Sequence, residues 1–296
     1  MRPVSRKEYL EFLASHDSVS IGGTQVKLYS ERTIDEYEPR SFVPEEWSVW
    51  SFPNRGDWAT HDGGYRGNWS PFIPRNLIHR FTGPGDLVCD PMAGSGTTLV
   101  ECRLMGRKGI GVDINLNAVM VAMNRLDFKL PNSGEAVQEG IGLFHGDARN
   151  LNEVEGESVD LVATHPPYCS IISYSVAPGD LSQLSLEDFV REIGRVAGEC
   201  FRVLKPNKYC GVLIGDTRKR SHYVPIHIGV LGKFLDAGFV MKEDVIKLQH
   251  NTIGARERWT NSSYDFYKIG HEHLYVFRKP MKSEDTSEFK YSKRWW

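Results

Sequence analysis

The chain has 296 residues and an ordinary globular composition, with 40% hydrophobic and 25% charged residues, so it is long enough to bury a full core. No apolar run reaches membrane-spanning length, and the N-terminal stretch lacks the apolar core of a signal peptide, so we expect a cytoplasmic protein without a membrane partner. The five cysteines form no C-x-x-C pair, which indicates reduced thiols and no cysteine zinc site.

The net charge of −2 conceals an asymmetry along the chain. Residues 1–200 hold 18 Lys and Arg against 28 Asp and Glu, a net of −10, whereas residues 201–296 hold 18 against 10, a net of +8. The basic C-terminal third offers phosphate contacts to a nucleic acid or forms an ordinary solvated surface, and both interpretations are open on charge alone.

The N-terminal part begins with a predicted helix at residues 5–16 and continues without helical or strand periodicity. Within it, residues 47–72, hereafter the aromatic segment, are rich in Trp, Phe, Tyr, Gly and Asp. Such aromatic content argues against disorder, and long irregular segments in compact proteins are often functional. We therefore take residues 1–73 as an N-terminal unit whose aromatic segment is a candidate for holding nucleic acid.

From residue 74 the chain alternates between helical and strand patterns. Helices are predicted at residues 74–81, 97–106, 117–128, 186–204 and 226–238. Strands are predicted at residues 86–90, 108–114, 141–147, within 158–168, and at 209–216, 240–249 and 273–279. This alternation predicts an α/β fold with a parallel sheet, helices on both faces and ligands at the carboxyl ends of the strands. Residues 281–296 form a polar tail.

The first motif, DPMAGSGTT, is a glycine turn between a strand and a helix, where a ligand approaches the backbone closely. The third glycine of a dinucleotide fingerprint would fall at position 99, which is Leu99, so a pyrophosphate ligand is disfavoured. Asp113 and Asp147 lie at the ends of the next two strands, where a carboxylate can bind the ribose hydroxyls and the adenine amine of an adenosyl ligand. Asp90, at the end of the first strand, would then face the amino-acid end of that ligand. Three acidic strand ends suit the cationic S-adenosylmethionine, although single Asp residues often only cap helices. The expected cofactor residues are Asp90, Pro91, Ala93, Gly94, Ser95, Gly96, Thr97, Asp113, Ile114, Asp147 and Ala148.

The second motif is His165-Pro166-Pro167-Tyr168, at the end of another apolar strand. Two prolines make a rigid turn without N–H donors, so the Pro166 carbonyl and the His165 ring can both accept hydrogen bonds, and Tyr168 offers a ring for stacking. These are the groups that hold a flipped base by its exocyclic amine and direct its nitrogen at a methyl donor. Taken alone, the tetrapeptide is equally an ordinary turn.

Together the two motifs resemble the S-adenosylmethionine-dependent amino-methyltransferases of DNA, which modify N4 of cytosine or N6 of adenine. DPMAGSGTT is similar to that family's DPFxGSGTT, and Pro166, Pro167 and Tyr168 match its (Asp/Asn/Ser)-Pro-Pro-(Tyr/Phe/Trp). The resemblance covers roughly residues 60–280. It implies a Rossmann-like methyltransferase fold whose mostly parallel, seven-stranded sheet has an antiparallel last strand, with residues 74–280 as the catalytic domain.

His165 departs from this pattern, because the family has Asp, Asn or Ser at this position. A neutral imidazole accepts one hydrogen bond and an imidazolium none, so we expect activity to fall at acidic pH as His165 becomes protonated. The preceding Thr164 resembles the cytosine-N4 type, commonly Thr-Ser-Pro-Pro-Tyr, which favours N4 of cytosine over N6 of adenine.

The resemblance implies double-stranded DNA as the partner, together with a possible restriction endonuclease and a second copy of the chain in a homodimer. Residues 248–270 are a candidate DNA-recognition loop that combines basic, aromatic and amide side chains. His271 and His273 share a face of their strand, but no third ligand is evident in the sequence, so no metal site is predicted. The residues expected to contact nucleic acid are Arg218, Lys219, Arg220, Arg256, Arg258 and Trp259.

Three other functions compete with this interpretation. Transfer-RNA guanine-N2 methyltransferases have similar motifs, but usually carry an RNA-binding domain upstream, for which residues 1–60 leave no room. A dinucleotide-dependent oxidoreductase is disfavoured by Leu99 and by the His-Pro-Pro-Tyr motif. A non-catalytic DNA-binding subunit would explain the unusual His165.

Overall fold

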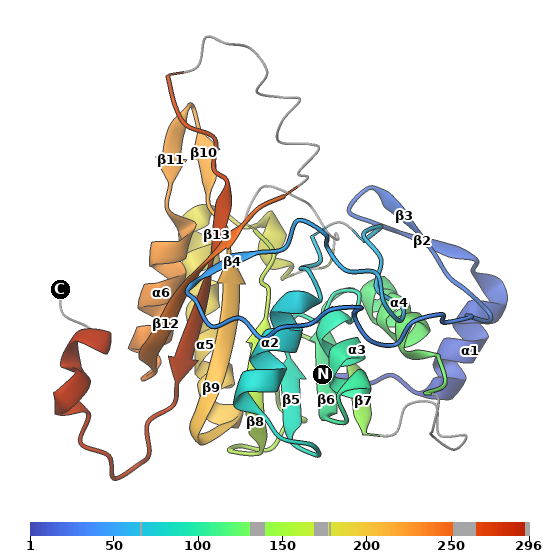
Figure 1. Ribbon diagram of the computed structural model, residues 1–296, viewed down its shortest axis with the longest axis horizontal. Coiled ribbons are helices and arrows are strands. Elements are labelled where there is room, and N and C mark those ends of the chain that lie inside the picture. The colour runs from blue at the N-terminus through green and yellow to red at the C-terminus, as the bar shows by residue number, and fades with distance from the viewer. Residues whose placement is uncertain (66, 131–139, 169–176, 178, 251–264, 294–296) are drawn as a thin grey trace.

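The computed structural model describes residues 1–65, 67–130, 140–168, 177, 179–250 and 265–293. Within these ranges, one sheet runs through the molecule with helices packed against it (Figure 1). Its strand order is β1-β7-β6-β5-β8-β9-β13-β12-β4. The strands are β1 (Arg2–Pro3), β4 (Val49–Ser51), β5 (Leu87–Asp90), β6 (Lys108–Asp113), β7 (Ile141–His145), β8 (Val159–Thr164), β9 (Leu204–Ile214), β12 (Val240–Leu248) and β13 (His271–Arg278).

The seven predicted strands form the centre of this sheet. β5 pairs in parallel with β6 and β8, β7 extends the sheet beyond β6, and β9 extends it beyond β8. β13 lies antiparallel between β9 and β12. The predicted Rossmann-like fold with an antiparallel last strand is therefore confirmed.

The sheet of the described residues is wider than the predicted seven strands. β1 pairs antiparallel with β7 at one edge, and β4 pairs in parallel with β12 at the other. These additions have two and three residues, too few for an alternating pattern to show in the sequence. Both come from residues 1–73, so this N-terminal unit contributes strands to both edges of the main sheet.

The helices are close to their predicted positions, with small differences at the ends. They are α1 (Arg6–Ser15), α2 (Phe72–Phe81), α3 (Thr97–Leu104), α4 (Leu116–Leu126), α5 (Leu186–Val203) and α6 (Ile226–Asp236), with 3-10 turns η1 (Leu181–Gln183) and η2 (Thr286–Ser292). α2 starts two residues before the predicted Pro74, which is tolerated in the first turn because N–H groups there lack intrahelical partners. α5 starts at a Ser185 cap, whose hydroxyl accepts from the Asp188 N–H at 3.1 Å.

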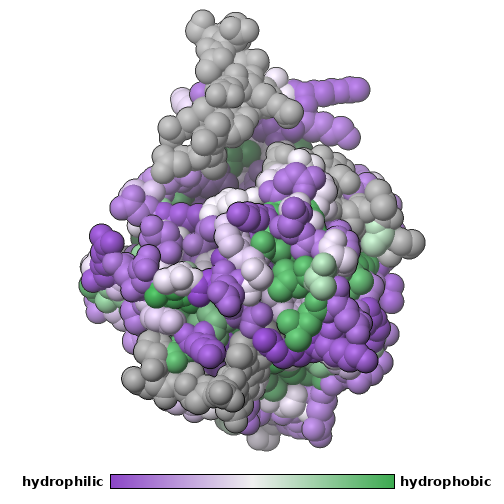
Figure 2. Space-filling model, turned by 90° about the vertical axis from the view of Figure 1, so that its right-hand side faces the viewer, coloured by the Kyte–Doolittle hydropathy of each residue, from purple (hydrophilic) through white to green (hydrophobic). Residues whose placement is uncertain are grey.

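Two hairpins lie outside the main sheet. β2 (Ser18–Ile21) and β3 (Thr24–Lys27) form one, and β10 (Thr217–Lys219) and β11 (His222–Val224) the other. The second hairpin follows β9 and projects beyond the carboxyl edge of the sheet (Figure 1). The face that carries α1 and the first hairpin is mostly hydrophilic, with apolar side chains gathered near its centre (Figure 2).

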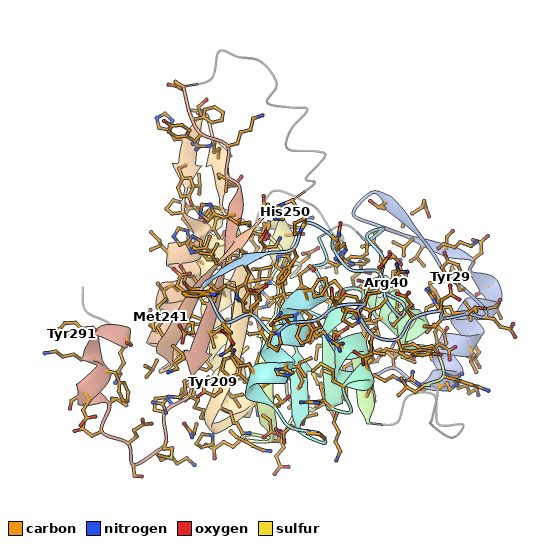
Figure 3. All side chains as sticks on the ribbon, in the orientation of Figure 1. Tyr29, Arg40, Tyr209, Met241, His250 and Tyr291 are labelled. Carbon is orange, nitrogen blue, oxygen red and sulfur yellow. The ribbon has the colours of Figure 1, made fainter. Side chains whose placement is uncertain are left out.

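Two apolar layers separate the sheet from the helices. Along β9, Cys210, Val212 and Ile214 face α5 and α6, while Leu213 faces α2, as the alternation of side chains along a strand requires. Side chains fill the space between helices and sheet, whereas Tyr291 on η2 stands away from it (Figure 3). The four cysteines in the described ranges are buried and unpaired, and no helix there combines the length and apolar character needed to cross a bilayer.

The aromatic segment is fastened to the sheet domain by a buried carboxylate. Glu101 on α3 is fully buried and accepts from Trp58 Nε1 at 2.8 Å, His61 Nε2 at 2.7 Å and Arg75 Nη1 at 2.9 Å. Burial lowers the pKa of His61, although its bond to Glu101 opposes this. Because a buried charge is tolerated only when it is paired and hydrogen-bonded, these contacts fix Trp58 and His61 against α3.

We predict that Glu101→Gln lowers the free energy of unfolding by about 3 kcal/mol, because it removes the buried anion of Arg75 and leaves that cation only the largely exposed Glu38. Urea unfolding at pH 7 measures this. Glu11→Gln on α1 is the matched control, since Glu11 is exposed and pairs with the exposed Lys7 at 3.8 Å; it should change stability by less than about 0.5 kcal/mol. Equal stability of the two variants would contradict a structural role for Glu101.

Candidate active site

A pocket at the carboxyl edge of the sheet brings both sequence motifs together. Its walls come from the glycine turn, the residues after β6 and β7, the His-Pro-Pro-Tyr motif, part of the aromatic segment, and residues 179–181. All four residues of the second motif line it. The predicted cofactor residues that line it are Asp90, Pro91, Ala93, Gly94, Ser95, Thr97, Asp113, Ile114, Asp147 and Ala148.

Gly96 is the predicted cofactor residue that does not line the pocket, and its part is to build the turn. Its φ of 79° is left-handed, and α3 starts at the next residue. Leu99, in place of a third glycine, packs instead on a glycine of the strand: a Cβ at Gly111 would lie 2.4 Å from Leu99 Cδ1. The close approach of helix and strand is thus achieved with the glycine on β6.

The three acidic strand ends differ in their environments. Asp90 is buried and accepts from Thr98 Oγ1 at 2.5 Å, and burial raises its pKa to about 6. Asp113 accepts from the N–H groups of Gly94 at 2.9 Å and Asn115 at 2.8 Å, but burial outweighs these bonds and raises its pKa to about 6 as well.

Asp147 is held by an arginine that sequence reasoning missed. Arg149 donates to it from Nε at 2.9 Å and Nη2 at 2.5 Å, to Gly179 O at 2.9 Å and to Glu192 Oε2 at 2.7 Å. Burial would raise the pKa of Asp147, but the hydrogen bonds from Arg149 prevail and lower it. Asp147 is therefore a fixed anion, and Arg149 joins two walls of the pocket.

Part of the aromatic segment forms another wall of the pocket. Tyr65 is buried beside Gly94, and Trp69 is buried and stacks on the His165 ring, with centroids 5.9 Å apart and planes at 19°. Ser95 of the glycine turn lies near this wall and accepts from the buried Arg125 at 2.7 Å. The segment was predicted to hold nucleic acid; the structure places Tyr65 and Trp69 at the pocket.

The His-Pro-Pro-Tyr motif is tied to the last two strands of the sheet. His165 Nε2 lies 2.8 Å from Tyr168 Oη, which donates to Glu272 Oε1 on β13 at 2.5 Å. Lys247 on β12 donates to the other oxygen of Glu272 at 2.8 Å. Neither Glu272 nor Lys247 was a candidate from the sequence, because nothing in the spacing of these strands points at position 168.

The environment of His165 changes the expected pH dependence of this site. Burial lowers the pKa of His165 to about 4; Glu272 and the Gly67 backbone oppose the shift, and Lys247 and Arg55 add to it. The ring is therefore neutral through the range in which a histidine ordinarily titrates. An acid-side loss of activity near pH 6 would thus come from another group.

The structure describes three of the six residues expected to contact nucleic acid. Lys219 and Arg220 are exposed at the turn of the β10–β11 hairpin. Arg218 is partly buried and donates to the carbonyls of Ser221 at 3.0 Å and Tyr267 at 2.6 Å, so its guanidinium holds the hairpin. Arg256, Arg258 and Trp259, with most of the 248–270 loop, lie outside the described residues.

Near this hairpin, His273 belongs to a cluster of possible metal ligands that the sequence did not show, and His271 is not among them. Asp216, His227 and His273 lie within 4.8 Å of one another. His227 Nδ1 is 2.5 Å from Asp216, His273 Nδ1 is 3.1 Å from Asp244, and the two rings stack 4.1 Å apart. As it stands, the cluster is a set of paired side chains, since each imidazole is paired with a carboxylate.

The family of the chain follows from comparison with known proteins. A family model described as DNA methylase, of the N6/N4 methyltransferase type, matches residues 3–124 and 159–295, most of the chain. The chain belongs to this family. A second model, described as RMKL-like, methyltransferase domain, matches residues 79–216.

Among curated relatives, the DNA adenine methyltransferase YhdJ of Escherichia coli is 28% identical over 116 residues, 38% of this chain and 40% of that protein. A tRNA (guanine(10)-N2)-dimethyltransferase of Methanothermobacter thermautotrophicus is 32% identical over 128 residues, 43% of this chain and 34% of that protein. The chain thus matches less than half the length of these relatives. A geranyl diphosphate methyltransferase solved with S-adenosylmethionine has a TM-score of 0.50 at 12% identity, over 75% of this chain and 94% of its own, and shares the fold.

S-adenosylmethionine is the cofactor that membership of the DNA methylase family implies, and the pocket fits it. Among the described residues, Thr97 Oγ1 is buried at the pocket wall without a hydrogen-bond partner, which leaves it available to a polar ligand group. Asp113 and Asp147 place carboxylates on the same cavity, where hydroxyls, an amine and a cationic ligand are favoured.

We predict that S-adenosylmethionine affinity falls as the pH drops through about 6, because protonated Asp113 loses an acceptor and its charge. The loss should approach tenfold per pH unit below that pKa. Isothermal titration calorimetry from pH 8 to pH 5 measures it, with Asp113→Asn as the control that binds weakly and varies less with pH. A dissociation constant that stays unchanged over this range would contradict ligand binding by the Asp113 carboxylate.

Proposed function

We propose that this chain transfers the methyl group of S-adenosylmethionine to N4 of cytosine in DNA. The observation that carries the proposal is that the acidic cofactor wall and the His-Pro-Pro-Tyr motif line one pocket. A base that reaches this motif must leave the duplex stack, because only then is its exocyclic amine accessible.

S-adenosylmethionine supplies an electrophilic methyl group when it is bound. The protein's part is to bind and orient the amine. The Pro166 carbonyl and the His165 ring accept the two N–H groups, which favours a pyramidal nitrogen with its lone pair directed at the methyl carbon. With the methyl group moved to the nitrogen, the sulfur would leave as a neutral thioether with the electron pair of the broken carbon–sulfur bond, and the cationic amine would give one proton to water. Trp69, stacked on His165, keeps that ring in place.

The exposed Lys219 and Arg220 suit contacts with the phosphate backbone. They stand on the hairpin that follows β9, at the carboxyl edge of the sheet, where the strand ends that line the pocket also lie. Such contacts would position the duplex without reading its sequence.

Two alternative substrates are open within this proposal: the N6 amine of adenine in DNA, and an RNA. Thr164 before the motif favours cytosine N4, whereas the similarity to a protein named DNA adenine methyltransferase supports adenine N6. The similarity to a protein named tRNA (guanine(10)-N2)-dimethyltransferase supports an RNA substrate. The second family model also extends over both motifs.

Mass spectrometry of nucleosides tests the proposal directly. DNA and RNA are taken from cells that lack their own DNA methyltransferases and express either this chain or His165→Ala as the matched control. We expect N4-methylcytosine in DNA with the unchanged chain and at least tenfold less with the variant, because one acceptor of the amine is gone.

Detection of N6-methyladenine in DNA would show that adenine, and not cytosine, is the target base. N2-methylguanosine in RNA, with unmodified DNA, would overturn the proposal in favour of the RNA enzyme. The absence of every methylated base would favour a non-catalytic subunit.

A further inference from the structure

Glu272 is a buried carboxylate aimed at the second motif from outside it. It is 6% exposed and lies on β13 opposite Lys247 of β12, its cross-strand neighbour in register. The neighbours of Glu272 on β13, His271 and His273, point to the other face, so Glu272 alone of the three reaches Tyr168.

The charge on Glu272 is maintained by its two partners. Burial by itself would raise its pKa, but the Lys247 ammonium and the donated hydrogen bonds prevail and lower it. An ionised carboxylate only accepts hydrogen bonds. The 2.5 Å contact with Tyr168 Oη is therefore a charge-assisted bond in which the hydroxyl is the donor.

Counting protons along the chain of contacts then assigns the tautomer of His165. Tyr168 has one hydroxyl hydrogen, which is used on Glu272, so at the 2.8 Å contact its oxygen must accept from His165 Nε2. A neutral imidazole carries one hydrogen, which leaves the lone pair on Nδ1. The Gly67 backbone carbonyl also attracts a ring N–H, since it favours the charged ring. The Tyr168 oxygen, however, has no hydrogen left to offer Nε2, so the single hydrogen of the neutral ring stays on Nε2.

Tyr168 has little freedom to turn away from this arrangement. A Cβ at Gly215, directly after β9, would lie 3.0 Å from Tyr168 Oη. The hydroxyl is therefore enclosed between the ends of β9 and β13.

We propose that Glu272 is a positioning residue for the amine site: by taking the Tyr168 hydrogen bond, it makes His165 donate from Nε2 and keep Nδ1 as its acceptor. Its value for catalysis rests on the proposed methyl transfer, whereas the tautomer assignment does not. In this arrangement a histidine supplies one fixed acceptor to the amine, and the Tyr168 hydroxyl is an anchor without direct contact to the base.

The first test reads the tautomer without any reaction. Long-range ¹H–¹⁵N spectra of histidine-labelled protein at pH 7, with His165 assigned by its absence in His165→Ala, should show Nε2–H. Tyr168→Phe should lose this preference, because the phenyl ring offers Nε2 no acceptor. An Nδ1–H tautomer in the unchanged protein would overturn the proposal, even if the chain methylates no nucleic acid.

The second test measures steady-state kinetics on the nucleic acid found to be methylated. Glu272→Gln should lower kcat about ten- to a hundredfold, the worth of a hydrogen bond to a charged group, with KM and S-adenosylmethionine affinity unchanged. Glu272→Asp should recover part of the loss. Asp244→Asn is the matched control, a carboxylate of β12 that pairs with His273 away from the pocket, and it should leave kcat unchanged.

A double-mutant cycle decides whether Glu272 acts through Tyr168. The variant with both Glu272→Gln and Tyr168→Phe should be no slower than the slower single variant, since each substitution removes the charge-assisted bond between Tyr168 and Glu272. If the fold-losses of kcat in the two single variants multiply in the double variant, or if Glu272→Gln leaves kcat unchanged, the positioning role is wrong. If the unchanged chain binds S-adenosylmethionine but methylates no nucleic acid, the proposed function is wrong. The tautomer assignment is then still decided by the ¹H–¹⁵N spectra alone.

Discussion

The buried carboxylate of Glu101 is the contact on which the shape of the site depends. α3 starts at the glycine turn, so its position sets that of the cofactor wall. Glu101 on this helix binds Trp58, His61 and Arg75, and thereby fixes the start of the chain that leads to Tyr65 and Trp69. A segment without regular structure can form a pocket wall in this way, because a few buried polar bonds replace the hydrogen-bond ladder of a strand.

The carboxyl groups around the pocket differ in their pKa values because their hydrogen-bond partners differ. Asp90 and Asp113 are held by few donors, and burial raises both of their pKa values to about 6. Arg149 and Lys247 keep Asp147 and Glu272 as anions in spite of burial. The two sets have different parts: the first is sensitive to pH and to a ligand, and the second orients the groups around it.

The sequence was sufficient for those parts of the fold that repeat a pattern over many residues. The helices and six of the seven central strands were found to within a few residues, because each has an apolar face at helical or strand spacing. β9 was found too, but it starts five residues before the predicted 209. The glycine turn and the His-Pro-Pro-Tyr motif were placed correctly at strand ends. β1 and β4 were missed because their two or three residues gain stability only from pairing with distant strands. Arg149 and Glu272 were missed for a related reason: the sequence does not show that they meet Gly179 and Tyr168.

The central claim is that the glycine turn, the second motif and the aromatic wall form one binding cavity. Hydrogen–deuterium exchange with and without S-adenosylhomocysteine, the product form of the cofactor, tests it most directly. One cavity predicts that ligand slows exchange together in peptides that cover residues 90–97, 113–115, 65–69 and 165–168, with no change in α6. Protection confined to the glycine turn and Asp113, with residues 65–69 and 165–168 exchanging as in the free protein, would contradict the claim.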